Sequence, residues 1–445
     1  MTNRLIFQSA RMTGPVIQRG LSLIELMIAI TLGMLVMAGL LALFINITRN
    51  NSELARVNSQ IENGRFAIQV LENDIVHAGF WGTHVPQFDD LTYEVVPTDA
   101  PTAVPDPCLE AASWNAVHKN NLITIPVQAY NASPGSCVTN KFDNTDVLVV
   151  RHADTCAAGS GGNCEADIAG KLYFQHGLCE APMQAQAGSI NTITLEAGAS
   201  ATDDFYNGAR IRIVSGAGQG QIGVVGSAAG SYVGATKVAT MSANWAIAPD
   251  VTSKYVFDSG YVLGDAGFPF TKRDCTTTAD KRKYVSNIYY IRNYAATAGD
   301  GIPTLVRSTF GTSAGGAEAL IEGIDGFNVE IGVDNQSETG AAPVYTAAVA
   351  WADPATKLVA TNRGDGEPDE YVRCAATCTV DQLANAVAVK LYVLARAKEA
   401  TAGYTDTKIY QMGTVSRGPF NDGFKRHVFS TTVRLANVSG RRETP

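Results

Sequence analysis

An uncharged apolar segment near the start of the chain places the tightest limit on its fold. Residues 26–48 carry no charge, and 23 helical residues at about 1.5 Å each reach about 34 Å, enough to cross a hydrocarbon core of about 30 Å. A buried helix of a soluble protein could be equally apolar but is rarely so long. Arg4, Arg11 and Arg19 precede the segment without any acidic residue, so the positive-inside tendency keeps residues 1–20 in the cytoplasm and exports the remainder.

Glu25 stands at the edge of this apolar segment. A carboxylate at that position costs a few kcal/mol unless it is paired or neutralised, so Glu25 is a candidate functional residue. The alternative is an acid that stays hydrated near the lipid headgroups. A secretory signal fits the segment less well, because its apolar part is about half as long and ends at a cleavage site of small residues.

A seven-residue sequence, GLSLIEL, surrounds Glu25 at residues 20–26. It resembles the class III signal of type IV prepilins and type II secretion pseudopilins. The resemblance implies that a prepilin peptidase cuts after Gly20. Leu21, where the family usually has Phe, then becomes the N-methylated first residue and Glu25 the fifth. It also implies that Glu25 pairs with a terminal amine in the growing filament, which supplies the partner that a carboxylate needs in a low dielectric.

Helical periodicity continues beyond the apolar segment, over residues 50–78. Apolar side chains recur there at steps of three and four, with Gly64 occupying one place in the series. The series consists of Leu54, Val57, Ile61, Ile68, Leu71 and Ile75. We therefore expect one helix from about residue 22 to about residue 78, transmembrane over about 22–48 and ended by the glycines within 79–82. A free coiled coil is the alternative.

Four sequences resemble PilW-type minor pilins specifically. They are NGRFA at 63–67, AGFWG at 78–82, the segment 323–334 and the segment 425–437. The resemblance covers the first 82 residues closely and residues 284–438 in patches. It implies an α+β type IV pilin fold, in which the long N-terminal helix packs on a large antiparallel β-rich head.

The expected domains are a leader peptide (1–20), the pilin helix (21–82), a first part of the head (83–188), an inserted module (189–257) and the C-terminal β-sheet part of the head (258–445). Residues 83–187 are rich in loops and prolines. The inserted module is rich in Gly, Ala, Ser and Thr and resembles a small β-module that recurs in phage tail and surface proteins. A long β-meander of the same head is the alternative interpretation.

Short apolar and alternating runs predict the strands of the head and the inserted module. The predicted strands are 146–151, 171–175, 190–195, 210–214, 221–225, 237–241, 284–294, 303–307, 387–394 and 429–435. A further strand has Phe327, Val329, Ile331 and Val333 on one face, which is the pattern of a half-buried strand.

Eight cysteines follow the apolar segment, on its exported side. They are Cys108, Cys137, Cys156, Cys164, Cys179, Cys275, Cys374 and Cys378. An even number of cysteines in an oxidising compartment predicts disulfide bonds. Cys156 with Cys164 and Cys374 with Cys378 are close enough in sequence to close small loops, whereas the sequence does not pair the other four.

Residues 362–370 crowd four carboxylates into a turn that contains glycine. Asp365, Glu367 and Asp369 are hard oxygen donors that suit Ca²⁺. The register of an EF-hand loop fails because Thr361 and Arg363 occupy its ligand positions, so we prefer a solvated acidic loop, with calcium as the alternative. A zinc site using His152 and His176 is less favoured, because the chain has no C-x-x-C pair. No cofactor is otherwise expected.

Two catalytic-type motifs have structural explanations. Residues 218–223 fit G-x-G-x-x-G, but a dinucleotide site needs a following helix, and residues 224–227 cannot begin a convincing one. Residues 311–315 fit G-x-S-x-G, but Ser308-Thr309-Phe310 is a poor core strand for delivering Ser313 as a nucleophile. An open Gly/Ser loop accounts for the second match. We expect no enzyme activity.

Net charge limits the partners of the chain. Removing residues 1–20 with their three arginines changes the formal net charge from −8 to −11. So negative a chain is not expected to have a general nucleic-acid surface, because nucleic acid is also negatively charged. The resemblance implies a minor pilin of the type IV pilus, held in the inner membrane with a periplasmic head and then carried into the extracellular pilus. A head this large is expected at the tip, in the priming complex, where it supports pilus biogenesis, twitching motility or cell adhesion.

The partners implied by the resemblance are the prepilin peptidase, the pilus assembly platform, other minor pilins and the major pilin. A type II secretion minor pseudopilin shares the N-terminal segment and is the nearest alternative, although the patches at 323–334 and 425–437 favour a pilin. An adhesin at the pilus tip is the second alternative. An anchored enzyme is the third, for which no coherent set of residues was found.

Overall fold

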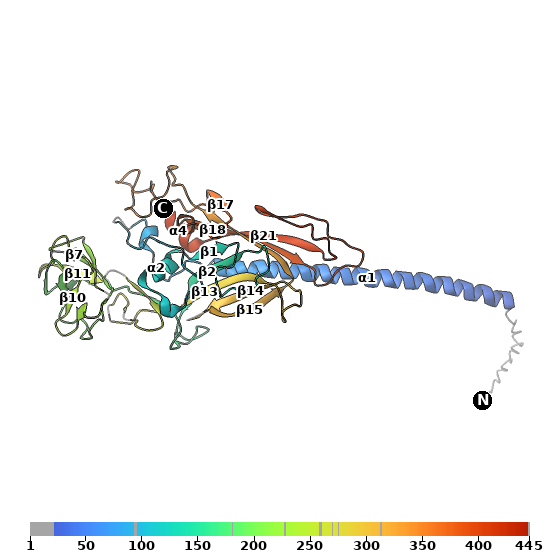
Figure 1. Cartoon of the computed structure of the whole chain (residues 1–445), viewed down its shortest axis with the longest axis horizontal. Coiled ribbons are helices and arrows are strands. Elements are labelled where there is room, and N and C mark those ends of the chain that lie inside the picture. Colours follow the sequence, from blue (N-terminus) through green and yellow to red (C-terminus); the bar gives the residue numbers. More distant parts are fainter. Residues whose placement is uncertain are drawn as a thin grey trace, which may run out of the picture. The chain divides into compact units, whose positions relative to one another are not determined.

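The computed structural model describes residues 22–92, 96–179, 181–226, 228–257, 260–268, 270–274, 276–311 and 314–443. The chain divides into two compact units after Asn58. Helix α1 (Leu23–Ile75) has 53 residues, so the predicted long N-terminal helix is confirmed (Figure 1). It ends three residues earlier than expected, and Gly79 then adopts the predicted left-handed backbone with φ +73°.

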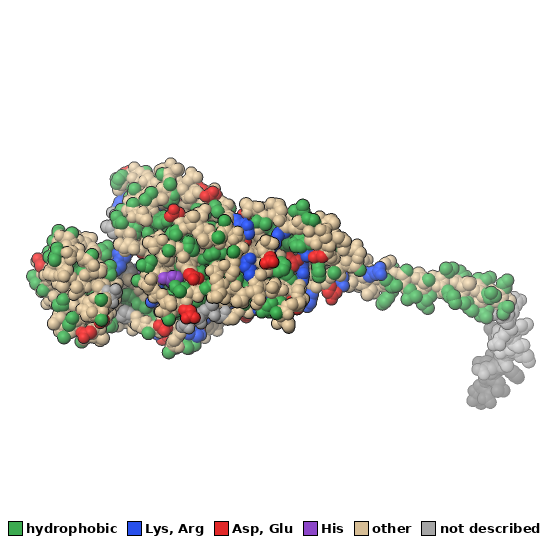
Figure 2. Space-filling view, in the orientation of Figure 1, with side chains coloured by type: hydrophobic (Ala, Val, Ile, Leu, Met, Phe, Trp, Pro, Cys, Tyr) green, Lys and Arg blue, Asp and Glu red, His purple; other side chains and the backbone are tan. Residues whose placement is uncertain are grey.

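The part of α1 that belongs to the first unit exposes its apolar side chains. Leu23, Met34 and Phe44 are each about two-thirds exposed or more, and Figure 2 shows apolar side chains over this part of the helix. By length and composition α1 can cross a membrane. Burying such a surface in lipid or between other helices would remove a large apolar area from water.

The part of α1 in the second unit buries one line of residues. These are Gln60, Gly64, Ala67, Leu71 and Ile75. The predicted stripe was therefore only partly right: Leu54 is exposed, and Ile61 and Ile68 lie at the margin of the buried line. Small and polar residues occupy its centre because the helix approaches the head closely there.

The largest sheet within the described residues has seven strands, all paired antiparallel. Its order is β1-β2-β13-β14-β15, and β3 pairs with both β13 and β12. The strands are β1 (Val127–Tyr130), β2 (Val147–Ala157), β3 (Tyr173–His176), β12 (Tyr261–Gly264), β13 (Lys281–Arg292), β14 (Thr304–Phe310) and β15 (Ala314–Glu322).

A second antiparallel sheet has the order β17-β16-β18-β21. Its strands are β16 (Ile324–Val333), β17 (Glu370–Val372), β18 (Ala386–Arg396) and β21 (Arg426–Arg434). Side chains from both sheets, including Leu148, Phe327 and Leu391, share one core with Leu71 and Ile75 of α1. The two sheets and the loops that join them are called the head below.

Strand β16 corrects the prediction of a half-buried strand, because all ten of its residues are buried. Phe327, Val329 and Ile331 face the apolar core, as the alternation predicted. On the opposite face, Asp325 bonds to Arg426, and Glu330 accepts from the amide of Thr414. Hydrogen bonds therefore allow polar side chains to be buried where alternation suggested solvent.

The chain around the inserted module forms a separate apolar core, which includes Ile213, Tyr232, Trp245 and Tyr255. Two four-stranded antiparallel sheets enclose it, with the orders β5-β6-β10-β9 and β4-β11-β7-β8 in the part of the chain that is described. The strands are β4 (Met183–Gln184), β5 (Ala187–Gly188), β6 (Thr192–Thr194), β7 (Arg210–Ser215), β8 (Ile222–Val224), β9 (Tyr232–Val233), β10 (Val238–Thr240) and β11 (Lys254–Phe257).

The remaining elements are short, and sequence patterns did not predict them. They are η1 (Gln87–Asp89), η2 (Ala111–Ser113), α2 (Ala116–Thr124), α3 (Val380–Ala384), β19 (Tyr410–Met412), β20 (Val415–Arg417) and α4 (Ala436–Arg442). Together with the long helix and the antiparallel sheets they give an α+β architecture, as the type IV pilin resemblance implied.

Candidate functional site: the N-terminal helix and its attachment to the head

Glu25 takes part in a reciprocal cap at the start of α1. Its side-chain oxygen accepts a hydrogen bond from the Ser22 amide at 3.1 Å, and the Ser22 hydroxyl oxygen accepts one from the Glu25 amide at 3.2 Å. This is a capping box, which satisfies amides that a helix start leaves without partners. The S-x-x-E spacing is the signature of that motif, so the capping role of Ser22 could have been predicted from the sequence. Gly20 and Leu21, the predicted processing residues, lie outside the described residues.

Two amide side chains fasten α1 to the head. The Gln60 side chain donates to the main-chain oxygen of Ala395 at 2.8 Å, and Gln60 itself is buried. One turn further, the Asn63 side chain donates to the main-chain oxygen of Glu322 at 3.2 Å. Ala395 belongs to β18 and Glu322 ends β15, so α1 contacts both sheets of the head.

Gly64 lies directly against the ring of Phe429 on β21. A Cβ built on Gly64 would lie 2.1 Å from the ring carbon Cε2, well inside the distance at which carbon atoms can pack. Gly64 therefore allows the helix and strand to approach closely, which explains a glycine in the middle of a helix despite its poor helix propensity.

Gly64→Ala should therefore destabilise the head by about 1–3 kcal/mol, even though alanine favours a helix by about 0.5–1 kcal/mol in the interior. The cost of overpacking exceeds the gain in helix propensity because the added methyl group would have to displace an aromatic ring. Urea unfolding of the detergent-solubilised chain measures the change. The matched double variant, Gly64→Ala with Phe429→Leu, should recover part of the loss; a stabilising effect of Gly64→Ala alone would show that the contact is loose.

Near the end of α1, the carboxylate of Asp74 bonds to two neighbouring strands. One oxygen lies 3.0 Å from Nε2 of His152 on β2, and the other accepts from the side chain of Asn287 on β13 at 3.0 Å. Asp74 and His152 are both nearly buried. The sequence singled out only His152, and only as a less favoured zinc ligand, because the three residues lie far apart in the chain and form no local motif.

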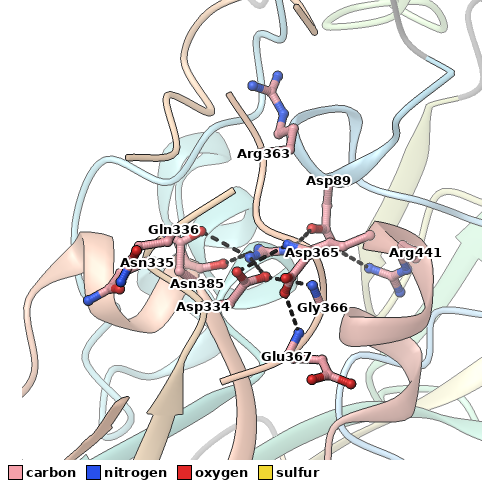
Figure 3. A network of polar contacts seen from close by, with 12 residues as sticks. Asp89, Asp334, Asn335, Gln336, Arg363, Asp365, Gly366, Glu367, Asn385 and Arg441 are labelled. Atoms are coloured by element: carbon pink, nitrogen blue, oxygen red, sulfur yellow. Dashed lines mark hydrogen bonds and ion pairs between the residues drawn. The ribbon is translucent and has the colours of Figure 1, made fainter. Parts of the chain in front are cut away.

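Arg442, the last residue of the C-terminal helix α4, is buried in the head. Arg442 bonds Asp89 at 2.7 Å, Asp334 at 3.2 Å, the Asn385 side chain at 3.0 Å and the main-chain oxygen of Ala384 at 2.7 Å. Burial opposes the charge of Arg442, but the two carboxylates outweigh it and raise the pKa of the guanidinium. The surrounding polar network is shown in Figure 3.

The acidic loop lies beside this network. Asp365 accepts from the amide of Glu367, and Asp369 accepts from the amides of Asn335 and Gln336. Figure 3 shows Asp365 and Glu367 along one loop, with the Glu367 carboxylate turned away from Asp365. In the part of the chain described here, no group of three or more acidic, His or Cys residues could hold a metal ion. Calcium binding stays a hypothesis without support from this geometry.

The cysteines that the structure describes form disulfide bonds. Cys156 pairs with Cys164 and Cys374 with Cys378, as their spacing suggested, and Cys108 pairs with Cys137. Cys179 is also disulfide-bonded, and Cys275 lies outside the described residues. Bonded cysteines cannot supply the thiolates of a zinc site.

The two catalytic-type motifs lie in connections between strands. Gly218 and Gly220 have positive φ in the turn between β7 and β8, and a strand follows where a dinucleotide site needs a helix. The G-x-S-x-G sequence begins directly after β14 and its last two residues belong to β15, which pairs antiparallel with β14, whereas a nucleophile elbow joins a strand to a helix. Ser313 lies outside the described residues.

Comparison with protein families gives two matches. Residues 288–437 match PilW, described as Type IV Pilus-assembly protein W, and this region runs from β13 into α4. Residues 17–41 match the prokaryotic N-terminal methylation motif, which includes Gly20, Leu21 and Glu25. Neither curated proteins nor solved structures gave a match. PilW proteins are structural components of the pilus. The methylation motif at its start and the PilW region in its head together support a PilW-type pilin.

Proposed function

We propose that this protein is a minor pilin that is cleaved after Gly20, N-methylated at Leu21 and assembled through α1 into a type IV pilus. One observation carries the proposal: a methylation motif and a PilW region occur in the same chain. The exposed apolar half of α1 supports it, because that surface needs lipid or other helices around it. Glu25, at the start of this surface, pairs with the terminal amine of a neighbouring subunit.

In this proposal the protein waits in the inner membrane with its head in the periplasm and then enters the extracellular pilus. The disulfide bonds agree with an oxidising compartment for the head. The partners are the prepilin peptidase, the assembly platform, the major pilin and other minor pilins. Because a head of this size would crowd a repeating shaft, its place is at the tip, in the complex that primes assembly.

A deletion strain distinguishes this function from that of a type II secretion pseudopilin. We expect the strain to lose surface pili and twitching motility while it secretes type II substrates normally. A plasmid copy of the gene should restore the pili and the twitching motility. Loss of secretion with normal twitching would overturn the proposal in favour of the pseudopilin.

A tip adhesin is the second candidate, because the chain around residues 189–257 has an apolar core of its own. Removing residues 183–257, which include all eight of its strands, tests this candidate. If the segment is the adhesive part, the variant should still restore pili to the deletion strain but not attachment to surfaces. Normal attachment by the variant would exclude the adhesin function for this segment.

A further inference from the structure

His152 has a hydrogen-bond acceptor at each ring nitrogen. Nε2 faces a carboxylate oxygen of Asp74 at 3.0 Å, and Nδ1 faces the main-chain oxygen of Ala153 at 2.9 Å. Neither a carboxylate nor a carbonyl oxygen can donate, so both contacts form only if both ring nitrogens carry hydrogen. A neutral imidazole has one hydrogen on its nitrogens and must give up one of the two bonds.

The partner carboxylate is held from a second side by a chain of two hydrogen bonds. The Asn287 side chain donates to the second oxygen of Asp74, and Thr309 donates to the side-chain oxygen of Asn287 at 3.0 Å. Asn287 lies on β13 and Thr309 on β14, and their backbones are paired in the sheet. Asp74 therefore cannot follow His152 if the ring turns away, because strands β13 and β14 hold it.

We propose that Asp74 and His152 form a pH-sensitive latch, which holds the last turns of α1 to the head while His152 is protonated and loosens when it loses its proton. The latch joins the end of α1 to β2, so its opening would leave Asp74 bonded to the sheet through Asn287 of β13 alone. This proposal depends on the proposed function in one respect. If the head is exported, the pH of the compartment outside the inner membrane is the signal that opens the latch.

Burial and the neighbouring carboxylates act on the charge of His152 in opposite directions. Burial disfavours the charged ring, but the hydrogen bond and charge of Asp74, the Ala153 oxygen and the charge of Asp154 on β2 outweigh it, so the pKa of His152 is raised. From α1, the ring centre of His77 lies 5.6 Å from that of His152, and Nδ1 of His77 faces the Asn73 oxygen. From β13, the Tyr289 hydroxyl is kept protonated by burial, which raises its pKa.

The sign of the effect follows from the raised pKa. The latch stabilises the closed contact fully at pH values below the pKa of a free histidine, about 6.5, and loses that contribution as the pH rises through the higher pKa of the folded protein. The equilibrium between closed and open contact should change by up to about tenfold for each unit by which the pKa is raised.

Hydrogen exchange of the detergent-solubilised full-length chain, read by mass spectrometry from about pH 5 to about pH 9 and corrected for intrinsic exchange, tests the latch. Protection at residues 68–78 should fall with rising pH in the wild type. In His152→Gln, which can still donate to Asp74 but does not titrate, protection should not depend on pH. His77→Gln is the matched control and should keep the wild-type dependence.

A direct titration keeps the test decisive if His152→Gln does not fold. In the wild type, NMR of the histidine ring carbons should give His152 a pKa above about 6.5. A pKa at or below that value, or the same pH dependence in His152→Gln as in the wild type, would overturn the latch. Neither result would bear on pilus assembly, which the deletion strain tests separately.

Discussion

Glu25→Gln is expected to leave cleavage after Gly20 unchanged and to reduce the amount of the protein in sheared pili by at least about tenfold. Glutamine is accepted at this position of a capping box, so its side-chain oxygen can still receive the hydrogen bond of the Ser22 amide. The substitution removes the charge and keeps the helix cap. A loss of incorporation would therefore come from the missing ion pair with a neighbouring subunit and not from a frayed helix.

Ser22→Ala is the matched control for this experiment. It removes the hydroxyl oxygen that accepts from the Glu25 amide but keeps the carboxylate, at a cost of about 1 kcal/mol in capping. Incorporation of this variant should stay close to that of the wild type. If Glu25→Gln entered pili normally while Glu25→Ala and Ser22→Ala both failed, the residue would serve the cap alone and the pairing hypothesis would be wrong. Immunoblots of sheared pili and of membranes provide the two measurements.

Arg442→Met should lower the free energy of unfolding of the head by about 3–5 kcal/mol. The guanidinium is the bond partner of Asp89 and Asp334, both of which are buried. Methionine leaves those two carboxylates in a low dielectric without their shared cation, although Arg441 still reaches Asp89 at 3.4 Å. Urea unfolding of the solubilised chain, followed by tryptophan fluorescence, measures the change.

Arg434→Met is the control for the loss of one arginine. The side chains of Arg434 and its partner Glu443 are both half exposed, and an exposed pair contributes about 0–1 kcal/mol because water screens it and the side chains lose freedom. Similar unfolding midpoints for the Arg442→Met and Arg434→Met chains would mean that the buried network does not stabilise the head.

Local patterns predicted the long helix and the central strands of the head. The apolar segment 26–48 and the alternating residues of β18 are patterns among residues close in sequence, so their periodicity is enough to predict the helix and the strand. Strand β15 was missed because its Gly- and Ala-rich start has no strand pattern, and it is held by the ladder to β14. Helix α2 was missed because its signal is one capping residue, Asn115, whose side chain accepts from the His118 amide.

The residues that attach the helix to the head could not be predicted in the same way. Glu25 was found because a charge beside an apolar segment is conspicuous, and the family resemblance gave it a role. Gln60 and Asp74 are ordinary polar residues of a helix until the tertiary structure brings Ala395 and His152 to them. Their importance depends on contacts between distant segments, which a single sequence does not show.

Co-expression of the full-length chain with an active prepilin peptidase, followed by intact-mass analysis, shows whether the chain is processed as a prepilin. We expect a mass loss equal to residues 1–20, together with the small increase of one methyl group on Leu21. The Gly20→Trp chain is the negative control. It should stay uncut in the same experiment, because a bulky side chain would lie next to the scissile bond. If an active peptidase leaves the wild-type chain whole, the protein is not processed as a prepilin and cannot be a pilin of this type.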